Sequence, residues 1–126
     1  MDMEAMVREA YERLGRWDSE ALLELFSGDA KFFVPGGTRV SGDHGRDAIA
    51  SILGTMREIA SEGFRRDILG VAPTSAGAMV VLHEFVTRDG EEIGYHSVHD
   101  WDVRDGKVAY WWVYVHEYDA FERAWS

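Results

Sequence analysis

Apolar residues recur at helical spacing in two neighbouring stretches near the start of the chain. Residues 3–15 (MEAMVREAYERLG) carry them at intervals of one, three and four, which is the stripe of an amphipathic helix. The residues of this stripe are Met6, Val7, Ala10, Tyr11 and Leu14. Gly15 is expected to end the helix. Asp18 is placed to cap a second helix over residues 19–26.

The next part of the chain combines a short strand, a glycine-rich loop and another helical pattern. Residues 30–34 (AKFFV) predict a strand that Pro35 stops, and residues 35–45 have the glycine density of a loop with sharp turns. Residues 45–60 then predict a third helix. Its apolar positions at helical spacing are Ala48, Ile49, Ile52, Leu53, Met56 and Ile59.

From residue 64 onward the pattern is typical of β-structure. A PTSAG turn and two Asp-Gly turns separate four runs rich in β-branched and aromatic residues. These runs are residues 64–72, 78–88, 91–104 and 107–118. The tail, residues 119–125, would add a short amphipathic turn. The pattern therefore predicts an α+β fold in which three helices precede a four-stranded antiparallel meander.

Composition narrows the classes of partner. The 126 residues fit one domain, residues 1–126. With 13 Lys and Arg against 23 Asp and Glu, the formal net charge is -10, and no basic cluster interrupts it, so nucleic acid and anionic membranes are not expected partners. There is no cysteine for a disulfide or a thiolate nucleophile. An acidic start without an apolar run, and no stretch of about 20 apolar residues, predict a cytoplasmic protein.

The order of these elements resembles that of the NTF2-like superfamily. Residues 17–37 (WDSEALLELFSGDAKFFVPGG), 41–49 (SGDHGRDAI) and 98–114 (VHDWDVRDGKVAYWWVY) are similar to its SnoaL-like and ketosteroid isomerase-like branch. The resemblance implies a cone, in which the three N-terminal helices pack on a strongly curved antiparallel sheet around an apolar pocket. It also implies a homodimer through the outer face of the sheet.

Comparison with the ketosteroid isomerases leaves one candidate group. Val34 stands where those enzymes have the proton-shuttling Asp before a Pro, and Leu53 stands where they have a Tyr donor. The position of their oxyanion-hole Asp corresponds to His99. Because two of the three functional positions are apolar, steroid enolisation with that machinery is not expected.

Strand alternation sorts the side chains of residues 91–104 between two faces. The set that shares a face with His99 is Tyr95, Ser97, Trp101 and Val103, and the resemblance places this face toward the cavity. A two-residue turn at residues 89–90 would pair Val80 with His99 and Glu84 with Tyr95. Glu84 and His99 would then lie roughly 13 Å apart along the strands, too far for a direct bond.

The outer face and the last strand are less constrained. The same turn places His83 opposite His96 on the outer face. The second Asp-Gly turn can be a two-residue turn or a loop with a glycine bulge. The short turn would place Tyr110, Trp112, Tyr114 and His116 inside, and the bulge would place Ala109, Trp111, Val113 and Val115 inside. The resemblance favours the second set.

A buried imidazole suits acid/base chemistry, since its ordinary pKa is near 6.5, burial lowers that pKa and a carboxylate raises it. We expect His99 to move a proton, with Glu84, Tyr95 and Tyr11 as helpers. The expected substrate-binding residues are Trp101, Trp111, Val34, Leu53, Phe33 and Val113. No cofactor is expected, and no metal site either, because His96 and His99 point to opposite faces of a strand.

Three kinds of function are consistent with these features. The leading one is a small-molecule acid/base enzyme that isomerises, cyclises or opens an epoxide of an apolar cyclic, polyketide- or terpenoid-like substrate. The second is a dehydratase similar to scytalone dehydratase. The third is a module that binds an apolar ligand or dimerises without catalysis. A hydrogen-bonded histidine in a core is common, so His99 alone does not separate them.

Overall fold

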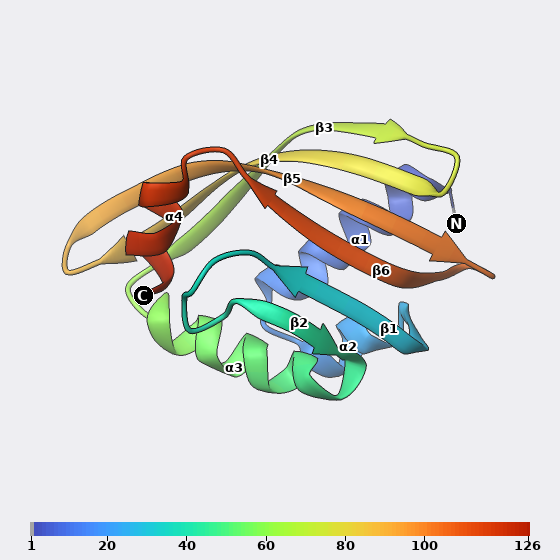
Figure 1. The fold of residues 1–126 in the computed structure, drawn as a ribbon, viewed down its shortest axis with the longest axis horizontal. Coiled ribbons are helices and arrows are strands. Elements are labelled where there is room, and N and C mark those ends of the chain that lie inside the picture. Colours follow the sequence, from blue (N-terminus) through green and yellow to red (C-terminus); the bar gives the residue numbers. More distant parts are fainter. Residues whose placement is uncertain (1) are drawn as a thin grey trace.

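The computed structural model describes residues 2–126 as four α-helices and a six-stranded sheet (Figure 1). The helices are α1 (Met3–Gly15), α2 (Ser19–Leu23), α3 (Ile49–Ile59) and α4 (Tyr118–Trp125), and a 3₁₀ turn, η1 (Arg46–Ala48), precedes α3. The strands are β1 (Phe26–Val34), β2 (Gly42–Gly45), β3 (Phe64–Pro73), β4 (Gly77–Arg88), β5 (Glu91–Arg104) and β6 (Lys107–Val115). The predicted α+β class is confirmed, with one additional helix formed by the tail.

The first two helices begin where capping residues stand. The Asp2 carboxylate accepts a bond from the backbone N–H of Ala5 at 2.7 Å, and Asp18 accepts one from Ala21 at 3.1 Å. All five residues of the predicted α1 stripe are buried. The prediction for α2 was too long, because the chain leaves the helix after Leu23 and Phe26 already begins β1.

The sheet has the strand order β2-β1-β6-β5-β4-β3. Two features differ from the prediction. Residues 42–45 of the expected loop form β2, which pairs antiparallel with β1. In addition, β1 runs parallel to β6, so the sheet is not wholly antiparallel. This parallel pairing joins the N-terminal strands to the meander and brings the start of the chain to the same cavity as its end.

The two Asp-Gly hairpins set which side chains face inward. Asp89 and Gly90 form a two-residue turn, and the predicted pairing of β4 with β5 is confirmed, including Val80 opposite His99. The second turn is also two residues long, but the pairing shifts by one residue within β6, at Ala109. The side chains of Trp111 and Val113 are therefore buried, as favoured above, although the bulge lies inside the strand rather than in the turn.

The sheet is strongly curved and is covered on its concave side. Figure 1 shows it arching over α1 and α3, with α4 beside the bend in β4 and β5. Side chains from both layers form the core; those without any exposed surface include Val7, Ala10, Val80, Leu82 and Trp101. The convex side carries the more exposed Val81 and Tyr114. Within residues 2–126 no helix has the length and apolar character needed to cross a membrane.

The close approach of β4 to β5 requires glycine at position 77. A Cβ atom there would overlap the backbone carbonyl oxygen of Trp101, which cannot move without breaking the sheet. We expect Gly77→Ala to lower the free energy of unfolding by about 1–3 kcal/mol in urea denaturation. Gly70→Ala in β3 is the matched control, since no atom would lie within 4 Å of its Cβ. Equal losses in the two variants would contradict this account of the β4–β5 contact.

Candidate functional site

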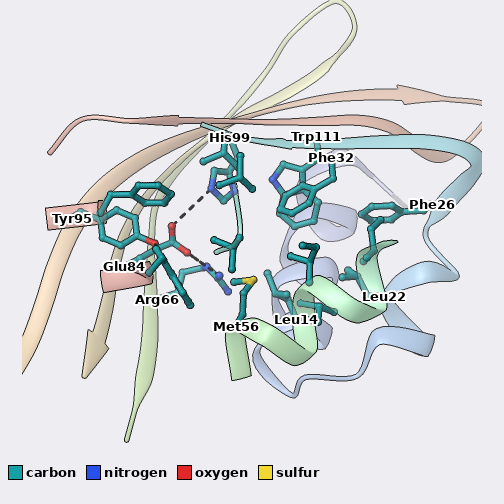
Figure 2. Close-up of a pocket in the computed structure, with 18 residues that line it drawn as sticks. Leu14, Leu22, Phe26, Phe32, Met56, Arg66, Glu84, Tyr95, His99 and Trp111 are labelled. Atoms are coloured by element: carbon teal, nitrogen blue, oxygen red, sulfur yellow. Dashed lines mark hydrogen bonds and ion pairs between the residues drawn. The ribbon is translucent and has the colours of Figure 1, made fainter. Parts of the chain in front are cut away.

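An apolar cavity lies between the concave face of the sheet and the helices (Figure 2). Its apolar walls come from α1, α2, α3, α4, β1 and β6, and include Leu14, Leu22, Phe26, Phe32, Met56 and Trp125. Its ionisable lining residues are Arg66, Glu84, Tyr95 and His99. The cavity volume is about 50 Å³, which is small for a ligand cavity. The site is therefore an apolar cavity with one polar wall.

Glu84 is a buried carboxylate held by two donors. Glu84 is only 4% exposed, and Arg66 lies directly opposite it in β3. Arg66 Nε donates to Glu84 Oε2 at 2.8 Å, and Ser97 Oγ donates to Oε1 at 2.8 Å. Burial raises the pKa of Glu84, but the charge of Arg66 and the bonds from Ser97 and Arg66 outweigh it and hold the pKa below its ordinary value. Glu84 is therefore ionised at neutral pH.

The tautomer of His99 follows from its partners. Tyr11 Oη lies 2.6 Å from His99 Nδ1, and Trp101 Nε1 donates to the same Tyr11 oxygen at 3.3 Å. Ser97 donates its only hydroxyl hydrogen to the Glu84 carboxylate, so its oxygen can only accept from His99 Nε2. The Tyr11 hydrogen therefore points to His99 Nδ1. Burial raises the pKa of Tyr11 well above its ordinary value, so this hydrogen stays on the phenol. Nδ1 is then an acceptor, and the hydrogen of the neutral His99 ring is on Nε2.

His99 is uncharged at neutral pH. Burial lowers its pKa to about 4, against a raising effect of the Glu84 charge and a further lowering effect of Arg66. Its Nε2 lies 3.4 Å from Ser97 Oγ and 3.8 Å from Glu84 Oε1. A directed chain of donors therefore runs from Trp101 through Tyr11, His99 and Ser97 to the Glu84 carboxylate.

The 3.8 Å approach of His99 to Glu84 corrects the sequence expectation. The strand partners were predicted correctly, with Tyr95 opposite Glu84 and Val80 opposite His99. A separation of roughly 13 Å between Glu84 and His99, however, assumes a flat sheet. On the concave side of a curved sheet, side chains converge, and Ser97 between them contacts both. The expected helper is thus in direct reach of the imidazole.

The structure brings together the four polar residues expected at the site. Glu84, Tyr95 and His99 line the cavity, whereas Tyr11 reaches His99 from outside the lining. Trp125 Nε1 donates to the Tyr95 hydroxyl at 2.8 Å. Burial raises the pKa of Tyr95 well above its ordinary value, and the charge of Glu84 adds to this. Both tyrosines therefore accept from an indole and keep a hydrogen to donate.

Four of the six expected substrate-binding residues line the cavity, namely Val34, Leu53, Trp111 and Val113. The other two do not. Trp101 is buried behind the wall, 4.5 Å from Trp111 between ring centroids. Phe33 stacks on Trp112 at 4.3 Å on the opposite face of the sheet, and Phe32 lines the cavity instead. Phe33 and Val34 are strand neighbours, so they could not both face inward.

Sequence reasoning missed two residues that bond to the polar wall, Arg66 and Trp125. Arg66 alternates with Phe64 and Ile68 in β3, so a charge on an otherwise apolar face was a usable sign of a buried partner. Trp125 lies in the tail that was predicted to form an amphipathic turn, but nothing local indicated its bond to Tyr95. On the outer face, His83 stacks on His96 at 3.9 Å as paired above. Among residues 2–126 no group of three or more His, Asp or Glu side chains is arranged to hold a metal ion.

Residues 7–111 match the family model of the SnoaL-like domain. The chain belongs to the SnoaL-like domain family. A search of curated proteins gave no significant match. Several solved structures resemble this SnoaL-like domain at identities that support a shared fold only.

Bal32a from a soil-derived mobile gene cassette is 24% identical, with a TM-score of 0.88 and 98% of this chain and 95% of that chain covered. TerC, co-crystallised with polyporic acid, is 20% identical, with a TM-score of 0.82 and 95% of each chain covered. An NTF2-like protein from Burkholderia xenovorans is 23% identical, with a TM-score of 0.70 and coverages of 97% and 94%. The predicted NTF2-like fold is confirmed.

The low pKa of His99 makes the stability of this SnoaL-like domain depend on pH. Between an unfolded pKa near 6.5 and a folded pKa of about 4, the unfolded chain binds a proton that the folded chain does not. The free energy of unfolding therefore falls as the pH drops through this window, by about 2 kcal/mol between pH 7 and pH 5 from His99 alone. Urea denaturation of wild type and His99→Gln at both pH values measures this difference. An identical pH dependence in the two proteins would show that His99 is not shielded from protonation.

Proposed function

We propose that this chain is a cofactor-independent acid/base enzyme that moves a proton on a small, uncharged, oxygen-bearing ring compound. The observation that supports this most is the contact between an ionised carboxylate, Glu84, and a neutral imidazole, His99, at the wall of an otherwise apolar cavity. Isomerisation, cyclisation and epoxide opening all need an acceptor and a donor of protons placed in this way.

Glu84 and His99 would have complementary roles. The Glu84 carboxylate would take a proton from a carbon next to a carbonyl. The electron pair of the broken C–H bond would form a C=C bond to the carbonyl carbon, and the π pair of the C=O bond would move onto the oxygen. The Nε2–H of His99 would donate to that oxygen in place of its long, 3.4 Å contact with Ser97 Oγ, since a fixed donor in an apolar site stabilises a developing negative charge strongly. Return of the proton from Glu84 to another carbon would complete an isomerisation. Arg66, Ser97 and Tyr11 are positioning residues in this scheme.

The charge balance of the cavity favours an uncharged substrate. Arg66 and Glu84 lie within 2.8 Å and are both nearly completely buried, so their charges compensate each other. A carboxylate or an ammonium group on the ligand would enter without a partner, at a high cost in desolvation. The small volume favours a single ring, and a polycyclic ligand would need the side chains of the lining to move. Co-crystallisation of the similar TerC with polyporic acid supports a small-molecule ligand.

Binding without chemistry is the second candidate. Both Glu84 oxygens already accept bonds, one from Arg66 and one from Ser97, so the carboxylate is a weakened base. In that case the polar wall would serve recognition alone.

We also propose that the outer face of the sheet, with Val81 40% and Tyr114 49% exposed, is the contact surface of a homodimer.

Deuterium incorporation separates catalysis from binding without knowledge of the natural substrate. In D₂O, the wild-type protein is expected to exchange the protons next to the carbonyl group of small cyclic ketones for deuterium. Proton NMR measures this exchange as the loss of the corresponding signals. Glu84→Gln should slow this exchange by about 10²-fold or more, as loss of a general base does. Glu92→Gln, a change of an exposed carboxylate on the same strand pair, should retain the wild-type rate.

Folding of the variant needs its own control, because Glu84→Gln leaves the Arg66 charge buried without a partner. The double variant Arg66→Gln/Glu84→Gln removes both charges, and circular dichroism reports whether each variant is folded. Full exchange activity in a folded variant without the Glu84 carboxylate would exclude Glu84 as the base. No exchange by wild type on any ketone would favour the binding function.

A further inference from the structure

Trp111 carries a buried hydrogen-bond donor without an acceptor. Its indole Nε1 has no partner among residues 2–126. The other two fully buried indoles both have one: Trp101 donates to Tyr11 and Trp125 donates to Tyr95. Buried indole N–H groups usually find a partner, because leaving one unpaired costs free energy. The unpaired donor therefore needs an explanation.

The position of Trp111 supplies one. Its ring lines the cavity, and Figure 2 shows the indole nitrogen on the edge nearer to His99. The ring is fixed by aromatic neighbours on several sides, so the direction of the N–H is fixed too. These neighbours, with ring centroids 4.5–5.9 Å away, are Tyr11, Phe26, Phe32, His99 and Trp101.

Among residues 2–126 no acceptor lies within hydrogen-bonding reach of this N–H. The oxygens of Glu84 accept from Arg66 and Ser97 instead, and the Tyr11 oxygen accepts from Trp101. His99 Nδ1 accepts from Tyr11, and its Nε2 carries a hydrogen. An acceptor for Trp111 must therefore come from a molecule that enters the cavity.

We propose that Trp111 donates a hydrogen bond to an oxygen of the bound ligand and so selects oxygenated rings over hydrocarbons of the same shape. This inference rests on the proposed small-molecule function of the cavity. It assigns the ligand a carbonyl or similar uncharged acceptor, placed beside the edge of Trp111 that faces His99. Trp111 is then a specificity-determining residue rather than only an aromatic wall.

Two probes of the same shape test the inference. Cyclohexanone carries an acceptor oxygen, and methylenecyclohexane has a CH₂ group in its place. Dissociation constants come from NMR titrations of wild type, Trp111→Phe and the matched control Trp112→Phe, whose ring lies on the outer face. The preference for the ketone should fall about three- to tenfold in Trp111→Phe, the worth of one hydrogen bond, and stay unchanged in Trp112→Phe.

A second measurement does not depend on the folding of any variant. In wild type, the assigned indole N–H resonance of Trp111 should move downfield with cyclohexanone and not with methylenecyclohexane. An unmoved resonance, an unchanged preference in folded Trp111→Phe, or no binding of either probe would overturn the inference. Deuterium exchange without this preference would leave the proposed catalysis standing and remove Trp111 from it. The preference without exchange would keep the role of Trp111 in a protein that only binds.

Discussion

The buried carboxylate of Glu84 sets the direction of the hydrogen bonds around the cavity. A carboxylate can only accept, and the indole of Trp101 at the other end can only donate. Between them, Tyr11, His99 and Ser97 each have both roles available, and the bond of Ser97 to Glu84 decides which role each takes. The tautomer of His99 is a consequence of this arrangement. Arg66 stabilises this arrangement, because its charge keeps Glu84 ionised where burial would otherwise favour the protonated form.

The fold contributes curvature and closure to this chemistry. Bending of β4 and β5 brings Glu84, Ser97 and His99 together from positions that a flat sheet would keep apart (Figure 2). α1 positions Tyr11 beside His99, behind the cavity wall, and the C-terminal α4 positions Trp125 beside Tyr95. Segments from both ends of the chain thus complete one site. The remaining walls are apolar, which strengthens each polar contact that is present.

Local pattern was sufficient for much of the fold and for part of the site. Helical periodicity located α1 and α3, and the Asp-Gly turn fixed the register that faces Val80 with His99. Relations between elements were harder to predict, because they depend on curvature and on packing. The distance between Glu84 and His99, the β1–β6 pairing and the bond of Trp125 to Tyr95 are of this kind. Phe33 differs, since strand alternation next to Val34 already argued against it.

The donor role of His99 depends on which ring nitrogen carries the hydrogen, and nitrogen-15 NMR of His99 at pH 7 observes this directly. The hydrogen-bonded chain predicts an uncharged imidazole with its hydrogen on Nε2 and a bare, hydrogen-bonded Nδ1. It also predicts that this signal survives acidification to about pH 5, because the pKa of His99 is about 4. A hydrogen on Nδ1, or an imidazolium at pH 7, would contradict the chain and the donor role of His99 that depends on it.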